Sequence, residues 1–110
     1  MPNMPAGDAV LARIRAQARA EQVRVTVHAH QEMVEDEVTM DELLQVANSG
    51  DVIEYYPEHR RGPCCLLHGV TAGGRHLHVV CTTSLEVLVI ITVYEPRPPK
   101  WPEPAVRRKS

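Results

Sequence analysis

The hydrophobic pattern near the C-terminal end is the most informative part of the chain. It predicts two β-strands, His76–Cys81 and Glu86–Tyr94, joined by a tight turn at Thr82–Leu85. The second strand is apolar on both faces as far as Ile91, which is typical of a central, buried strand. It is expected to end before Pro96, because proline has no N–H to donate to a strand ladder.

The first half of the chain alternates between helical and extended patterns. Asp8 can cap a helix that carries an apolar stripe, and Val23–Val27 alternates as an amphipathic strand does. His28–Glu37 has a helical composition. Thr39–Glu42 forms a capping box at the start of a further helix, which ends at Gly50, a residue suited to the left-handed closing conformation.

Two more strands, Asp51–Tyr56 and Cys64–Val70, follow these helices, and Thr71–Gly74 forms a hairpin turn after the second. The predicted order is helix, strand, two helices and four strands. Helices that precede a meander of strands indicate an α+β fold, here a single antiparallel β-sheet with helices packed on one face.

The chain is expected to form one small domain in three parts. These are an N-terminal helical arm (1–22), an α+β core (23–96) and a proline-rich basic tail (97–110). We expect Trp101 to anchor this tail against the core, because an exposed tryptophan is costly.

Composition narrows the class of protein. Hydrophobic residues make up 44% of the chain, and the formal net charge is -2, which is unusual for a general nucleic-acid binder. The longest apolar run, Val87–Ile91, is far below the roughly 20 residues that span a bilayer. The first residues lack the features of a signal peptide, so we expect a cytoplasmic protein without membrane contact.

Cys64, Cys65 and Cys81 are the three cysteines of the chain. Their odd number and their spacing fit neither a disulfide framework nor a zinc site. We therefore expect reduced thiols, and we expect no metal and no cofactor.

Histidines are the main candidates for chemistry. His28 follows the first predicted strand and lies in the first turn of a helix, where it could serve as a base or simply face solvent. With Glu32 and Asp36 it forms one helical stripe, which is more often a solvated face than a metal site.

Two polar pairs lie on the last two predicted strands. His76 and His78 share one face of their strand, and Thr92 and Tyr94 share one face of theirs. Whether the two faces coincide depends on the register, which the sequence does not determine. If they coincide, His28, His78 and Tyr94 could converge on one site.

Several segments together resemble a known family. The ordered set includes VTVHAHQEM, GDVIEYYP, RGPCCLLHGVTAGGRHLHVV and IITVYEPRPPKW. It resembles the uncharacterised bacterial family called domain of unknown function 4258, over most of the chain. That family is similar in element order to RelE/BrnT-like toxins, small ribonucleases with a β-α-α-β-β-β-β core.

The resemblance implies a surface on the sheet that binds or cleaves RNA without a metal. His28 or His78 would then act as base or acid, and Tyr94 would bond or stack on the RNA. Three further residues would hold it: Arg75, Thr92 and Lys100.

The sequence also departs from this family. Glu32 and Asp36 stand where many relatives carry arginines, and carboxylates repel phosphate. A second interpretation therefore remains open, in which the chain is a non-enzymatic interaction module that pairs with a small antitoxin-like protein. Oligomer formation is left open as well.

Overall fold

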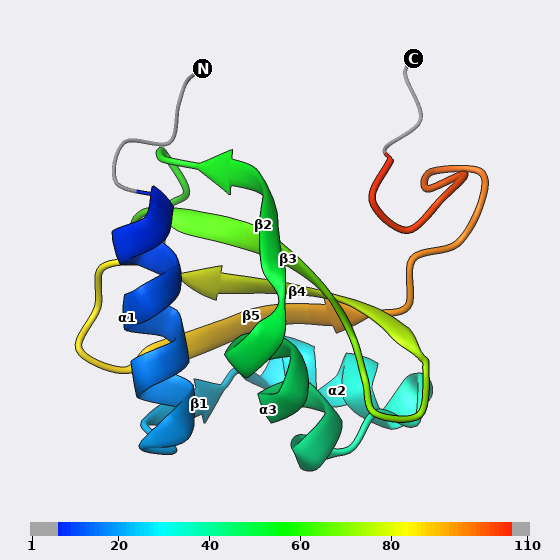
Figure 1. Ribbon diagram of the computed structural model, residues 1–110, viewed down its shortest axis with the longest axis horizontal. Coiled ribbons are helices and arrows are strands. Elements are labelled where there is room, and N and C mark those ends of the chain that lie inside the picture. Colours follow the sequence, from blue (N-terminus) through cyan, green and yellow to red (C-terminus); the bar gives the residue numbers. More distant parts are fainter. Residues whose placement is uncertain (1–6, 107–110) are drawn as a thin grey trace.

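The structure is a computed structural model, and it describes residues 7–106 (Figure 1). Three helices and five strands follow the predicted order. Their bounds are α1 Gly7–Arg19, β1 Val23–Val25, α2 Val27–Glu35, α3 Met40–Ser49, β2 Asp51–Tyr56, β3 Cys64–Val70, β4 His76–Thr82 and β5 Leu88–Tyr94.

The five strands form one sheet in the order β1-β5-β4-β3-β2. Strands β2 to β5 are an antiparallel meander, but β1 runs parallel to β5, with Val23 opposite Leu88. The expectation of a purely antiparallel sheet was therefore wrong. The alternation of Val23–Val27 reports which side chains are buried, and it carries no information about strand direction.

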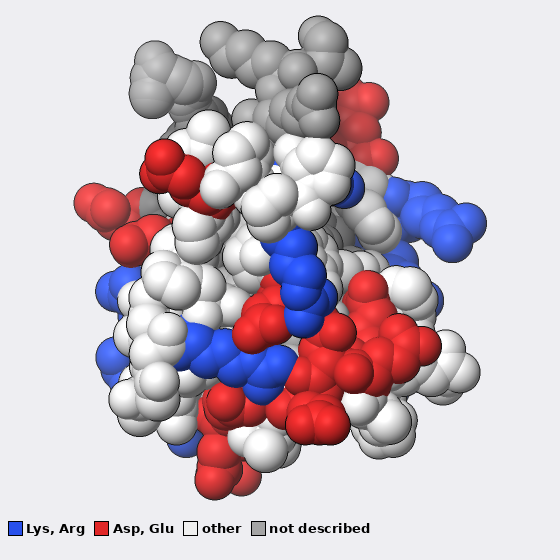
Figure 2. All heavy atoms as spheres, turned by 90° about the vertical axis from the view of Figure 1, so that its right-hand side faces the viewer, with Lys and Arg blue, Asp and Glu red and all other residues white. Residues whose placement is uncertain are grey.

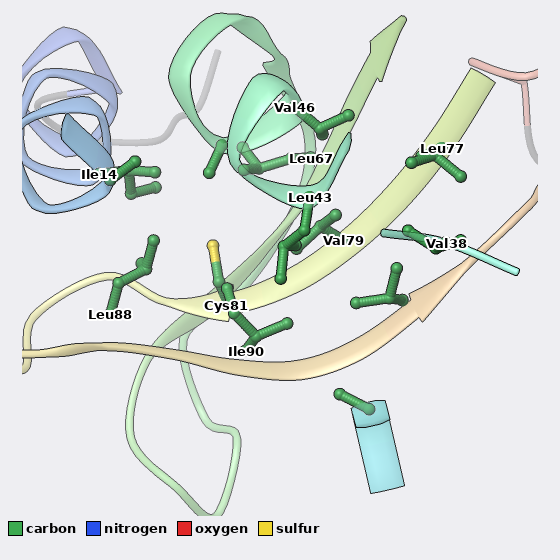
Figure 3. Close-up of a cluster of buried hydrophobic side chains, with 14 of the residues drawn as sticks. Ile14, Val38, Leu43, Val46, Leu67, Leu77, Val79, Cys81, Leu88 and Ile90 are labelled. Carbon is green, nitrogen blue, oxygen red and sulfur yellow. The ribbon is translucent and has the colours of Figure 1, made fainter. Parts of the chain in front are cut away.

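All three helices contribute to one hydrophobic core on a single face of the sheet (Figure 3). Alternate residues of the strands point toward the helices, as the predicted period of two requires. The α+β class is confirmed. Fully buried members of the core include Ile14, Leu43, Val46, Leu67, Leu77, Val79, Leu88 and Ile90. Because Ile14 of α1 is among them, the N-terminal helix packs as part of the domain.

Capping residues set most of the helix boundaries. The Thr39–Glu42 capping box is confirmed at the start of α3. Thr26 caps α2 by accepting the amide of Ala29, so the first strand stops at Val25, two residues earlier than expected. Asp8 was expected to cap α1, but it is instead part of the first turn of that helix.

Gly50 closes α3 in an extended conformation, with φ -74, so its predicted left-handed conformation was wrong. The requirement for glycine is spatial. A Cβ at this position would lie 2.7 Å from the carbonyl oxygen of Val46 and 2.9 Å from that of His68. Glycine therefore allows α3 to end directly against β3.

The predicted central position of β5 is confirmed for its first half only. Leu88–Ile90 lies between β1 and β4, and the register to β4 shifts between Val80 and Cys81. Beyond Ile90, β1 no longer covers β5. The second half of β5 is therefore an edge, and side chains of α2 lie beside it.

The C-terminal segment from Arg97 to Val106 leaves β5 on the side away from α3, and it contains turns rather than a helix (Figure 1). Trp101 is 3% exposed and packs against His78 with ring centroids 4.3 Å apart, so its predicted anchoring role is confirmed. The last basic residues of the predicted tail lie outside the described residues.

Candidate functional site

A row of polar side chains crosses the face of the sheet opposite the helices. Cross-strand pairing places Asp51 beside His68, His68 beside His78, and His78 beside Tyr94. Paired residues of antiparallel strands project from the same face. The two faces that the sequence left undetermined therefore coincide, and the Nδ1 of His78 lies 3.1 Å from the Tyr94 hydroxyl.

His78 lies beneath the C-terminal segment and is fully buried. Its Nε2 is hydrogen-bonded to the carbonyl oxygen of Pro104. A carbonyl can only accept, so Nε2 carries the proton, and in the neutral ring Nδ1 accepts from the Tyr94 hydroxyl. His78 thus orients Tyr94 from behind and has no solvent-exposed surface for a reactant.

Tyr94 opens on its other side to a pocket of about 400 Å³, which we call the tail pocket. Thr92 and Tyr94 come from β5, and Lys100 comes from the C-terminal segment. Three predicted site residues therefore line one hollow. The complete lining is Glu32, Thr92, Tyr94, Glu95, Arg97, Lys100 and Trp101.

Lys100 is exposed, and no carboxylate among the described residues forms an ion pair with it. Arg97 also lines the pocket, but it already pairs with the carboxylate of Glu95 at 2.6 Å. Glu95 pairs with Arg75 as well, at 2.8 Å. Lys100 is therefore the cation at the tail pocket that is available to an anionic ligand.

His28 lies at the edge of this site in the first turn of α2, as the sequence indicated. Its side chain is 65% exposed, and its Nε2 is 3.4 Å from the Oε1 of Glu32. Because Glu32 lines the tail pocket, the His28–Glu32 pair connects the exposed imidazole to the pocket.

Glu32 and Asp36 have a role that sequence reasoning missed. Glu32 accepts the amide of Val93 at 2.9 Å, and Asp36 accepts the amide of Glu95 at 3.1 Å. These amides point outward from the edge of β5. Four helical residues rise about 6 Å, and two strand residues span about 6.6 Å, so carboxylates at i and i+4 match alternate amides.

This match in spacing is the sequence feature that could have indicated such a contact. It also explains why acidic residues stand on this stripe. Among the described residues, no group of three or more histidine, cysteine, aspartate or glutamate side chains is arranged to hold a metal ion.

Arg75 does not line the tail pocket, although it contacts Glu95, which does. Its guanidinium donates to the carboxylates of Glu95 and Glu42 and to the backbone carbonyls of Glu37 and Asp36. The hydrogen bond to Glu95 is the main cause of its raised pKa. Figure 2 shows carboxylates gathered around a few basic side chains on this side of the molecule. Arg75 ties the β3–β4 hairpin to the α2–α3 connection.

The other histidines of the sheet and the cysteines contact other protein groups and do not line the tail pocket. His68 and His76 contact one another, with Nε2 and Nδ1 2.9 Å apart, and their rings are stacked. All three cysteines are buried and free. Burial raises the pKa of the Cys64 thiol to about 11, so very little reactive thiolate forms at neutral pH.

The fold and the site define a small α+β domain, with a single mixed five-stranded sheet, three helices and a polar pocket at the end of the sheet. The chain belongs to the family described as domain of unknown function (DUF4258), whose model matches residues 25–95. No curated protein and no solved structure matches the chain. Within residues 7–106, no helix has the length and apolar character needed to cross a membrane.

Proposed function

We propose that the chain binds single-stranded RNA at the tail pocket and cleaves it by a route that needs no metal. One observation carries this proposal: Thr92, Tyr94 and Lys100 line a single pocket, and the His28–Glu32 pair stands at its edge. The similarity in element order to RelE/BrnT-like ribonucleases, from which a role for Thr92, Tyr94 and Lys100 was expected, is in keeping with this function.

In this proposal Lys100 attracts a backbone phosphate, and Thr92 offers a hydroxyl to the same group. His28, oriented by Glu32, takes the proton of the ribose 2′-hydroxyl. The 2′-oxygen then attacks phosphorus and the bond to the 5′-oxygen breaks, which leaves a 2′,3′-cyclic phosphate. The departing 5′-oxygen takes a proton from water, and the proton held by His28 returns to solvent.

Tyr94 provides the aromatic wall of the pocket against which a base can stack. Its hydroxyl donates to the Nδ1 of His78, which orients the ring. His78 is a positioning residue in this scheme, because it acts through Tyr94 and touches no substrate.

The test is cleavage of a fluorescent single-stranded RNA by purified protein in the presence of a chelator. His28→Ala should lower the rate by about 10²-fold or more, the usual loss for a general base. His30→Ala is the matched control, since His30 lies on the same helix but outside the tail pocket, and its rate should equal that of the wild type.

Binding is measured separately by fluorescence anisotropy with the same RNA. Lys100→Ala should weaken binding and reduce its salt dependence, as the loss of one phosphate contact does. Arg24→Ala removes an exposed cation of β1 and should have little effect. RNA binding that is absent from the wild type, or unchanged by Lys100→Ala, would rule out this function.

A second function, as a protein-interaction module, is favoured by a separate observation. Several large apolar side chains are exposed together along α2, on the side away from the tail pocket. Their arrangement supports a particular chemistry for a partner, which is argued below.

A further inference from the structure

Three of the large exposed hydrophobic side chains gather around α2. Val27 is 76% exposed, Val34 is 65% exposed, and Met40 at the start of α3 is 43% exposed. Val27 and Val34 are seven residues apart, so they share one helical face. Single exposed hydrophobics are ordinary, but neighbouring ones mark a contact surface.

Val34 and Met40 border a hollow of about 240 Å³, which we call the α2 groove. The nearly buried Met33 and Val38 form its floor, and methionine adapts readily to different apolar partners. The groove lies beside β1, which is an edge strand of the sheet. Its complete lining is Val25, His30, Met33, Val34, Val38 and Met40.

The α2 groove and the tail pocket lie on opposite sides of the same helix. At about 100° per residue, the His28–Glu32–Asp36 stripe points almost directly away from the Val27–His30–Val34 stripe. Glu32 and Asp36 are bonded to the edge of β5, which leaves the second stripe on the outside. Both sites can therefore be occupied together.

The stretch of chain that forms α2 and the start of α3 is acidic. Between Arg24 and Arg60 the chain carries no lysine or arginine. Exposed carboxylates stand close to the groove in sequence, at Glu35, Glu37 and Asp41. An apolar hollow with an acidic rim complements an apolar ligand with basic flanks.

We propose that the α2 groove binds an amphipathic helix of a partner protein, with an apolar face flanked by lysine or arginine. Helices dock into such grooves through anchors at i, i+3 or i+4, and i+7. A second copy of the chain fits poorly, because a two-fold interface would bring the acidic rim against itself. RNA is repelled by the same carboxylates. The inference deepens the interaction function and does not depend on RNA cleavage.

The probe is a synthetic amphipathic helical peptide with leucines at i, i+3, i+4 and i+7 and lysines on both flanks. Its twin carries glutamates in place of the lysines. Fluorescence anisotropy with the full chain should show binding of the lysine peptide, with the glutamate twin weaker by about tenfold or more, as attraction is replaced by like-charge repulsion.

Val34→Asp places a charge in the groove and should weaken the lysine peptide by about tenfold or more, the effect of losing a central apolar anchor. Val70→Asp is the matched control, because Val70 is an exposed valine at the end of β3, and its affinity should be that of the wild type. Reversing the rim with Glu35→Lys and Asp41→Lys should weaken the lysine peptide and strengthen the twin.

Four results would overturn the proposal: no binding of the lysine peptide, equal binding of the twins, equal effects of the two valine variants, or a wild-type dimer that Val34→Asp dissociates. The last result would assign the groove to a second copy. RNA cleavage is measured on the same Val34→Asp protein and should be unchanged. Failure of the groove proposal and failure of the RNA proposal are therefore distinguishable.

Discussion

The position of His78 on the sheet could be expected from the sequence, but its burial could not. The period of two placed it on the same face as Tyr94, given the observed register. The sequence did not show that residues after Pro96 would return to cover it. A buried imidazole with partners for both nitrogens satisfies the hydrogen-bonding demand of burial, so we assign it a structural role.

His78→Ala should therefore lower the free energy of unfolding, by roughly 2 kcal/mol or more, because buried partners are left unsatisfied at about 1–3 kcal/mol each. His28→Ala changes an exposed side chain and should cost about 0.5 kcal/mol or less. Urea unfolding followed by circular dichroism measures both. Equal stability of the two variants would contradict the assignment.

At the scale of elements, α2 replaces a strand. The edge of β5 beyond Ile90 would otherwise present unpaired amides, which are a hazard for association between sheets. Glu32 and Asp36 accept two of those amides. From the sequence alone the stripe is interpreted as a solvated face or a metal site, because the sequence does not show which strand it faces.

Glu32→Ala should leave the Val93 amide without its acceptor and lower the free energy of unfolding by roughly 1–3 kcal/mol. Glu32→Gln keeps a carbonyl oxygen at the same place and should cost less. Hydrogen exchange provides the specific measurement, since the Val93 amide should lose protection in Glu32→Ala and retain most of it in Glu32→Gln. Unchanged exchange at Val93 in both variants would show that the contact does not stabilise the edge.

Local patterns predicted the elements well and their arrangement only in part. The bounds of β2 and β3 and the capping box of α3 agree with the structure, because alternation and capping chemistry act within a few residues. The direction of β1, the spatial need for Gly50 and the partners of Arg75 depend on residues distant in sequence. Three members of the candidate site came together because β5 leads directly into the C-terminal segment.

At the scale of the whole molecule, the sheet is covered on both faces by different means. Helices bury one face of the sheet. On the other face lies the short C-terminal segment, which is held to the sheet by its Trp101, a side chain that is only 3% exposed. This segment also supplies Lys100 to the tail pocket. Stability and the candidate site therefore share one anchor.

Trp101→Ala should lower the free energy of unfolding by roughly 3–5 kcal/mol, the usual cost of truncating a buried tryptophan. Trp101→Phe retains an aromatic ring against His78 and should cost less. Thermal and urea unfolding by circular dichroism are suitable, because the variants lack the only tryptophan as a fluorophore. A loss below about 1 kcal/mol for the alanine variant would mean that the segment does not anchor the fold.

The contact between His68 and His76 should make the stability of the protein depend on pH. Burial, and then the neighbouring His76, lower the pKa of His68 from the model-compound value of 6.5, while Asp51 opposes the shift. Because the folded state binds this proton less readily than the unfolded state, the contribution is fully present above about pH 6.5. It is lost progressively as pH falls below that value toward the folded pKa.

The free energy of unfolding of the wild type should therefore fall between pH 7.5 and pH 5.5 by more than that of His68→Gln, which cannot titrate. Comparing the two proteins removes the contribution of other groups that titrate in the same range. Identical slopes for the wild type and His68→Gln would show that the stacked pair does not couple protonation to folding.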